Sequence, residues 1–509
     1  MKRLKNNIFA ILLAAAILLA PSNSYSQSAT SAVKTEPSAI KAVSTFDNAA
    51  SSNEINDLVS FIKKENVIEE DTLSNGIKIV FKKNMHSDLV VYCLLLKAGS
   101  AFEPVEKNGI SCLLVKLIKK GNAKMNAVKI SDNIEKTGAV LSSEAKRNRV
   151  VFSLLSTLDS FEKNFDIYSE CIISPSFTKE EVDKEKKFLA ASLKIENDEI
   201  GIVCSKLFYK TIFAGHPYEK PSRGSLETIP NIKRDDILKW YKTIFIPENM
   251  TFVVVGNTDM KTVKAVIEKR FGNMAKNTKQ SKIFEDATKK IAIPIASAIS
   301  PREVREFKDK AAQCFICMGF ITEGVESKDY GALMMLNTIL GSGMSSRLFS
   351  ILRNKESLAY QINSSFQALS GNSALIMVMR CQESKYEKAI KGLKREIDRF
   401  RTEPVTQEEY NRARNKLVGT YAINRDTLIE QAIALINWES LGLGAKFENQ
   451  YLEKVLAPDR QELQKVAQKY FDPAKYTLAV IRPPKKVNKS SDAKTEIKKE
   501  GVNKKNENN

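Results

Sequence analysis

The sequence predicts an α+β fold of two homologous halves, each an α/β sandwich with a largely antiparallel sheet and helices packed on it. A chain of 509 residues is longer than one hydrophobic core usually serves, so at least two domains are expected. Residues 175–186 are echoed by residues 404–414, and in each a threonine followed by nearby glutamates indicates a capped helix start. Residues 245–255 are echoed by residues 471–481, where a helix end, a proline turn and an apolar strand follow one another. An internal repeat is the simplest explanation of both pairs.

Short apolar runs that alternate with longer amphipathic stretches indicate the elements of each half. In the first half we predict strands at 72–82, 89–97, 149–156 and 251–256, and helices beginning near Gly109 and at 127–137, 158–171, 179–197, 234–245 and 261–271. In the second half, which begins its repeat near Val304, strands are predicted at 313–320 and 375–380. Neighbouring strands joined in hairpin order favour an antiparallel sheet.

The two ends of the chain differ in composition from these halves. Residues 1–26 are predicted to be a secretory signal peptide, because a basic start precedes an apolar run too short for a membrane span and then small residues. An uncleaved membrane anchor is the alternative. Residues 27–66 are expected to form a flexible leader with one short helix near 54–64, and residues 485–509 a disordered, lysine-rich tail. The N-terminal half is therefore expected at 67–290 and the C-terminal half at 291–484.

These features predict an exported protein, periplasmic if its source has two membranes, with no membrane span in the mature chain. The net charge of +19 is compatible with anionic surfaces, nucleic acid or acidic peptides as partners. The lysines, however, are scattered beside acidic residues and lack the interleaved aromatic side chains that bind bases. Nucleic acid is therefore excluded as a partner.

Cysteine and histidine usage limits the possible chemistry. The seven cysteines form no short spaced framework, which argues against a disulfide scaffold even in an exported chain. Cys314 and Cys317 have the spacing of a redox or metal site, but they lie in a predicted strand and should point to opposite faces. The chain has only two histidines, His86 and His216, so no histidine-rich metal site can be built.

The segment from Asn108 to Gly121 carries the most informative motif. It resembles the zinc-binding helix of the insulinase, or pitrilysin-type, peptidases, in which Asn-Gly-x-x-His-x-x-Glu-His is followed by an apolar turn and Lys-Gly. In that family two histidines on one helical face bind Zn²⁺, and the glutamate between them accepts a proton from the metal-bound water. The corresponding positions here are Cys112, Val115 and Lys116.

The third ligand position of the family is changed as well. It is the second glutamate of a Glu-x6-Glu segment, and here Glu185 is retained but the ligand position is Ser192. Because the framing residues stay in register while all four chemical positions differ, we predict that the zinc site is absent. The chain is then predicted to have no metal cofactor of its own.

A second motif of the family is retained. Residues 340–360 resemble its C-terminal signature, in which a glycine-rich turn leads into Leu-Arg-x-Lys-x-x-Leu-Ala-Tyr. The resemblance implies that Arg353 and Tyr360 bind the substrate backbone and help to polarise the scissile carbonyl, work that suits two hydrogen-bond donors. The alternative is a purely structural role, in which the arginine's charge complements the helix dipole at a C-terminus and the tyrosine packs at the edge of the core.

The resemblance, which covers about residues 68–483, implies a specific role. Some members of this family divide labour between a zinc-bearing subunit and a subunit that supplies only the arginine and tyrosine. We therefore expect a non-catalytic subunit, inactive alone, that pairs with a zinc-bearing homologue and acts with it on unfolded peptides. The rival hypothesis is a stand-alone pseudopeptidase that binds peptides or serves as an envelope scaffold.

Three further alternatives remain at this point. The chain could bind zinc through relocated ligands, which the scarcity of histidine disfavours. The glycine-rich turn at 341–346 could cradle phosphate, although no Lys-Ser/Thr follows it. Cys112 beside Lys116 could be an activated thiolate, although no histidine lies near it in sequence.

Overall fold

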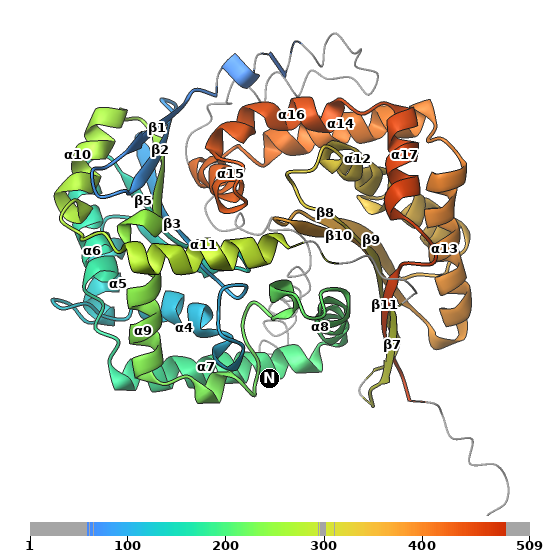
Figure 1. The fold of residues 1–509 in the computed structure, drawn as a ribbon, viewed down its shortest axis with the longest axis horizontal. Helices are drawn as coiled ribbons and strands as arrows, with labels where there is room; N and C mark the ends of the chain where they lie inside the picture. Colours follow the sequence, from blue (N-terminus) through green and yellow to red (C-terminus); the bar gives the residue numbers. More distant parts are fainter. Residues whose placement is uncertain are drawn as a thin grey trace, which may run out of the picture.

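The computed structural model describes residues 57, 59–60, 62–64, 66–293, 295, 302–309 and 311–484 (Figure 1). The predicted signal peptide, most of the leader and the predicted tail lie outside the described residues. The described residues from 57 to 64 are helical, and Ile62 packs into a core cluster of the second half.

The described residues form two sheets, one in each half of the sequence (Figure 1). The first has the order β1-β2-β6-β3-β5-β4. Its strands are β1 (Ile68–Thr72), β2 (Lys78–Lys83), β3 (Leu89–Lys97), β4 (Val140–Ala145), β5 (Arg149–Thr157) and β6 (Met250–Gly256). The β2·β6 pair is parallel and the others are antiparallel.

The second sheet has the order β7-β11-β8-β10-β9. Its strands are β7 (Arg302–Phe307), β8 (Cys314–Glu323), β9 (Gln361–Gln367), β10 (Asn372–Cys381) and β11 (Thr477–Arg482). Here β7·β11 is parallel and the remaining pairs are antiparallel. Apart from β1, each strand of the first sheet has a counterpart with the same neighbours and directions in the second. The prediction of two homologous α+β halves is thereby confirmed.

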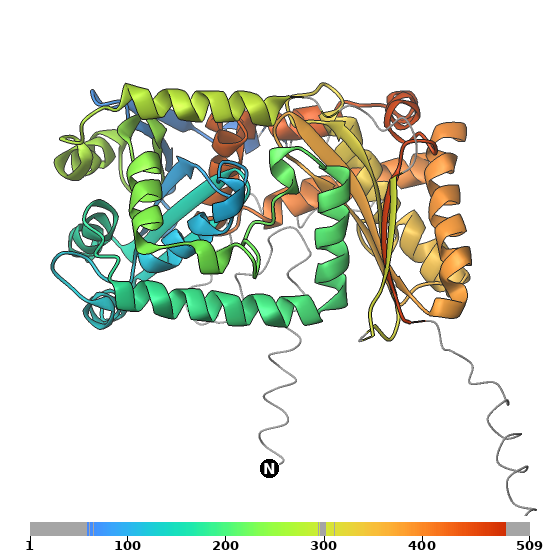
Figure 2. The same ribbon diagram turned by 60° about the horizontal axis from the view of Figure 1, so that its bottom comes forward.

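Helices surround both sheets (Figures 1 and 2). In the first half they are α4 (Ile110–Leu117), α5 (Ala127–Glu135), α6 (Phe161–Ile173), α7 (Lys179–Asp198), α8 (Ile200–Ile212), α9 (Arg234–Ile244), α10 (Met260–Phe271) and α11 (Thr278–Ala292). In the second half they are α12 (Tyr330–Gly341), the π-helix η5 (Leu348–Lys355), α13 (Tyr386–Thr402), α14 (Gln407–Ile423), α15 (Leu428–Ser440), α16 (Glu448–Leu456) and α17 (Arg460–Tyr470). Short 3₁₀ turns are η1 (Val105–Lys107), η2 (Pro217–Glu219), η3 (Ile229–Asn231), η4 (Pro247–Asn249), η6 (Glu383–Lys385) and η7 (Ala445–Phe447).

The two echoed segments have the structure that the repeat predicts. Thr178 caps α7 by accepting a hydrogen bond from the Glu181 amide, and Thr406 caps α14 in the same way with Glu409. Each threonine satisfies a backbone donor that has no partner within its own helix. The second echo becomes η4 followed by β6 in the first half, and a turn followed by β11 in the second.

Each half contributes one helix that packs on the sheet of the other half, and these two helices are called the exchanged helices. Helix α8 of the first half packs on β8 and β11 of the second sheet, where Phe208 and Cys204 join Cys317 and Ile376 in one apolar cluster. Helix α15 of the second half packs on β3 and β6 of the first sheet, with Leu435 among the residues it buries there. Both views show α8 against the second sheet, and Figure 1 shows α15 against the first. Strands covered on both faces read as continuous apolar runs, as β3 does.

Some elements differ from their sequence predictions. The single strand predicted at 72–82 is a hairpin of β1 and β2, because Gly76 adopts φ +100° in the turn between them. Strand β4 and helices α8 and α11 were not predicted. The predicted opposite orientation of Cys314 and Cys317 is confirmed, since they belong to core clusters on different faces of the sheet. In the part of the chain that the structure describes, no helix is long and apolar enough to cross a membrane.

Candidate functional site

Helix α4, which carries the altered zinc motif, begins over a buried carboxylate. Glu103 accepts hydrogen bonds from the Asn108 side chain (2.8 Å) and from the amides of Gly109 (2.6 Å) and Ser111 (2.9 Å). Burial raises the pKa of Glu103, while these hydrogen bonds oppose the rise. An acceptor at a helix start satisfies amides that have no partner within the helix. The retained Asn108 is therefore part of the support of α4.

The glycine of the motif also has a structural reason. Gly109 has φ +101°, and a Cβ there would lie 2.9 Å from the Arg223 carbonyl oxygen and 3.0 Å from the Gly224 Cα. The loop that contains Arg223 thus crosses directly over the start of α4, where a larger residue would not fit. His216, at the beginning of the same loop region, is buried, and its Nε2 lies 3.0 Å from the Ile291 carbonyl oxygen. The contacts of this region give it a structural role.

The end of the motif is tied to α7. Lys120 forms an ion pair with the retained Glu185 at 3.0 Å, and the Glu185 side chain is buried. Helices α4 and α7 pack against each other, which brings the motif's two segments together. Asn108, Gly109, Lys120 and Glu185 therefore maintain the helix pair irrespective of any metal.

Cys112 and Ser192 share one guanidinium group as a neighbour. Arg223 donates from Nη2 to the Ser192 hydroxyl at 2.9 Å, and its positive charge acts on the Cys112 thiol. The same guanidinium forms an ion pair with Glu196, one turn further along α7. Arg223 therefore links the first and third of the family's ligand positions.

Val115 and Lys116 complete the altered site. The Val115 side chain is buried, and its carbonyl oxygen accepts a hydrogen bond from Ser143 of β4 at 2.7 Å. Lys116 is partly exposed. Burial raises the pKa of the Cys112 thiol, and the positive charges of Arg223 and Lys116 offset only part of that rise. The thiol is therefore neutral near pH 7 and does not fit the role of an activated nucleophile.

These residues do not fit a zinc ion. Zinc in proteins is bound by thiolates, neutral imidazoles and carboxylates, whereas this position has a neutral thiol, a hydroxyl, an ammonium and a guanidinium. Among the described residues, no group of three or more His, Cys, Asp or Glu side chains could hold a metal ion.

Arg353 and Tyr360 lie together on the second half. Both line an open pocket of about 390 Å³, whose other lining residues include Ser357, Gln382 and Lys385. The Tyr360 side chain is 53% exposed, and its hydroxyl accepts a hydrogen bond from Gln382 at 2.8 Å, so its own proton can be donated. Lys385 donates to the Ser357 carbonyl at 2.7 Å.

The donors of this pocket suit oxygen acceptors. The Arg353 guanidinium stacks over the Phe349 ring at 4.5 Å, and no carboxylate in the described part of the chain forms an ion pair with it. Two cations and a phenol hydroxyl therefore face one pocket, which fits the carbonyl or carboxylate oxygens of a peptide.

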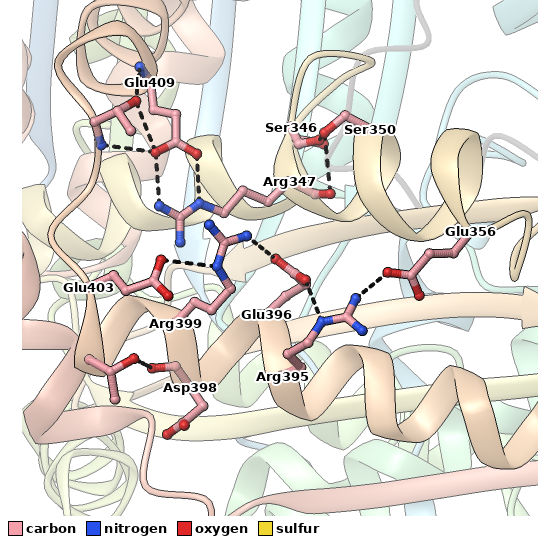
Figure 3. Close-up of polar contacts among 12 residues, drawn as sticks. Ser346, Arg347, Ser350, Glu356, Arg395, Glu396, Asp398, Arg399, Glu403 and Glu409 are labelled. Carbon is pink, nitrogen blue, oxygen red and sulfur yellow. Dashed lines mark hydrogen bonds and ion pairs between the residues drawn. The ribbon is translucent and has the colours of Figure 1, made fainter.

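The π-helix that carries Arg353 is held at both ends (Figure 3). At its start Arg347 donates to the two carboxylate oxygens of Glu409 at 2.7 and 2.8 Å, and Glu409 also caps α14. Just after its end Glu356 accepts from Arg395 of α13 at 2.5 Å. Short π-helical segments occur frequently at functional sites, and this one is fixed by a buried, bidentate ion pair.

The Arg347–Glu409 ion pair predicts that the stability of the protein falls at acidic pH. Burial would raise the pKa of Glu409, but hydrogen bonds from Arg347 and Thr406 outweigh it and lower the pKa to about 2. An unfolded glutamate has a pKa of about 4.3, so the stabilisation is complete above about pH 5 and is lost as the pH falls toward 2. We expect Glu409→Gln to lower the melting temperature at pH 6, with the difference from the wild type roughly halved at pH 3. If the difference in melting temperature between the two proteins is the same at pH 6 and at pH 3, the lowered pKa of Glu409 is wrong.

Sequence reasoning missed two contributors to these sites. Arg223 was one of them, because nothing in the sequence showed that it lies beside Cys112 and Ser192. The Arg347–Glu409 pair was also missed, although Glu409 belongs to a recognisable capping sequence. No local signal relates either residue to its partner.

Comparison with known proteins finds two matching family models. The family model described as "Insulinase (Peptidase family M16)" matches residues 78–225, and that of the "Peptidase M16 inactive domain" matches residues 231–417. Together the two matches span well over half of the chain.

Two relatives come from one bacterium, Helicobacter pylori. The zinc protease PqqE is 23% identical over 428 residues, covering 82% of this chain and 93% of the relative. The non-peptidase homolog YmxG is 21% identical over 413 residues, covering 81% of this chain and 93% of the relative. The crystal structure of a protease from Helicobacter pylori superposes with a TM-score of 0.75 at 21% identity, covering 82% of this chain and all of that one.

The fold, the matched family models and the absence of zinc ligands at the motif agree with one another. The chain belongs to the insulinase family of M16 peptidases.

Proposed function

We propose that this chain is the non-catalytic subunit of an exported insulinase-like zinc peptidase. It pairs with a zinc-bearing homologue and supplies Arg353 and Tyr360 for binding unfolded peptides at the partner's site. One contrast carries the proposal. The zinc position has a neutral thiol, a hydroxyl and two cationic side chains, whereas Arg353 and Tyr360 line an open pocket in which both can donate hydrogen bonds.

The chemistry of the pocket supports a role in peptide hydrolysis. A guanidinium and a phenol hydroxyl donate hydrogen bonds to carbonyl oxygens, and such donors stabilise the charge that develops on the scissile carbonyl. The anchored π-helix supplies the fixed position that Arg353 needs for such stabilisation. Lys385 adds a positive charge that attracts peptide carboxylates.

The comparisons support a division of labour. Helicobacter pylori has a relative named as a zinc protease and another named as a non-peptidase homolog, and each matches most of this chain. The predicted signal peptide at residues 1–26 supports export, with the periplasm as the site of action in a double-membraned cell.

The test is reconstitution with the zinc-bearing homologue from the same organism. Each purified protein, and then their mixture, is assayed for cleavage of a fluorogenic peptide and for complex formation by size-exclusion chromatography. We expect no cleavage by this chain alone, a mixed complex, and a kcat/KM at least about tenfold above that of the homologue alone. A chelator should abolish the mixed activity.

The rival role gives the opposite result. If this chain is a stand-alone pseudopeptidase that binds peptides or acts as an envelope scaffold, the homologue's activity will not change on mixing and the two proteins will elute separately. That outcome would end the proposal of a shared peptidase.

A further inference from the structure

The seven cysteines are all buried and reduced in this structure, but two of them face each other across a pair of strands. Cys314 begins β8 and Cys381 ends β10, and the antiparallel register sets them directly opposite each other. Directly opposed residues share one face and have Cα atoms about 4.5–5.5 Å apart, within the range that a disulfide spans. Both side chains belong to the same core cluster.

The surroundings of this pair are charged. The Cys314 thiol donates to Glu383 at 2.5 Å, and Glu383 also forms an ion pair with Arg482. The neighbouring Cys314 lowers the pKa of Cys381 despite the opposing effect of burial, and the positive charges of Arg482 and Lys385 act in the same direction. Cys381 is thus favoured as the first thiolate.

The pair also lies beside the Arg353–Tyr360 pocket. Gln382, the residue after Cys381, donates to the Tyr360 hydroxyl, and Lys385 donates to the Ser357 carbonyl. The end of β10 therefore positions two lining residues of the pocket. A covalent link at Cys381 would hold this strand end to β8.

We propose that Cys314 and Cys381 form a disulfide that fixes the strand end bordering the pocket. The Cys381 thiolate attacks the disulfide of an oxidant, such as oxidised glutathione or a dithiol oxidoreductase, and releases one thiol. The Cys314 thiolate then attacks the mixed disulfide, which forms the Cys314–Cys381 bond and releases the second thiol. Because both sulfurs are buried, the reaction takes place as the chain folds.

The other cysteines are engaged differently. Cys204 lies near Cys317, but its thiol already donates to the Ala479 carbonyl at 3.4 Å, and the pair joins a helix to a strand instead of two registered strands. Cys93 contacts Ser153 at 3.2 Å, and Cys171 contacts Asn122 at 3.6 Å. These four cysteines and Cys112 are expected to stay reduced.

The test is refolding of the full chain in a glutathione redox buffer, followed by alkylation in denaturant and peptide mass mapping. We expect two of the seven thiols to be protected and one linked peptide pair joining Cys314 to Cys381. Cys314→Ser and Cys381→Ser should each leave all six remaining thiols free, whereas Cys93→Ser should still lose two. Seven free thiols in refolded protein, or a link between Cys204 and Cys317 instead, would overturn the proposal.

This outcome is independent of the proposed subunit role. The proposal relies on export only for the cellular location of the oxidation, and the refolding experiment contains neither the partner nor a peptide substrate. A missing disulfide would leave the reconstitution result untouched, and a failed reconstitution would not affect the thiol count.

Discussion

Arg353→Ala is expected to lower kcat/KM of the mixed complex about 100-fold, because removal of one donor to a developing oxyanion typically costs 10²–10³ in rate. Arg353 lines the open pocket, stacks on Phe349 and forms no ion pair with the described carboxylates, so its truncation should not disturb the core. The measurement is peptide cleavage by the zinc-bearing homologue saturated with the variant chain. Tyr360→Phe, which removes only the exposed hydroxyl, should also lower kcat/KM.

A matched control is available on the same half. Arg412 of α14 pairs with the exposed Glu408 through an i,i+4 ion pair, so Arg412→Ala should change cleavage by less than about twofold. Both variants should form the mixed complex with unchanged elution. If Arg353→Ala and Tyr360→Phe leave the mixed activity at the wild-type level, these residues do not act at the partner's site.

Glu448→Gln is expected to lower the free energy of unfolding by about 3–5 kcal/mol, the usual cost of removing one partner from a buried ion pair. The Glu448 carboxylate accepts hydrogen bonds from Arg425 (2.9 Å), Trp438 (2.7 Å) and Tyr421 (2.7 Å), and its side chain is 2% exposed. Burial would raise its pKa, but Arg425 and these hydrogen bonds lower it to about 2. The neutral amide would leave the Arg425 guanidinium buried without a counter-charge.

The same helix supplies the control for this substitution. Glu453 of α16 pairs with Lys63, and both side chains are about half exposed, so Glu453→Gln should cost less than about 1 kcal/mol. Thermal melts followed by circular dichroism would compare the two variants. Equal shifts in melting temperature would show that the buried pair is not a principal support of the second half.

The sequence predicted those features of the fold that depend on local patterns. Thr178 and Thr406 marked helix starts, and the proline turns before β6 and β11 marked strand starts, because capping and turn chemistry act over a few residues. The exchange of α8 and α15 was not predictable in this way. An apolar helix face shows that a helix packs on something, but not which sheet it covers.

In the candidate site, too, the sequence predicted the residues of the motifs but not their long-range contacts. The family resemblance placed Cys112 and Ser192 at one site, and it also paired Arg353 with Tyr360. It did not show that Arg223 bridges the first two residues, because that contact depends on a loop folded over Gly109. Nor did it show that Arg347 anchors the π-helix, since Glu409 comes from a helix more than fifty residues away.

The exchanged helices α8 and α15 determine how this chain can be divided. A cut between α11 and β7 would give two fragments, each with its own sheet but with an apolar face that only the other fragment's helix covers. Neither fragment would fold stably alone, because each needs the helix of the other fragment to bury its apolar sheet face. The fragments would instead behave as complementary parts of a split protein, recovering the native fold on mixing, and the repeat would then be a duplication whose copies have become mutually dependent.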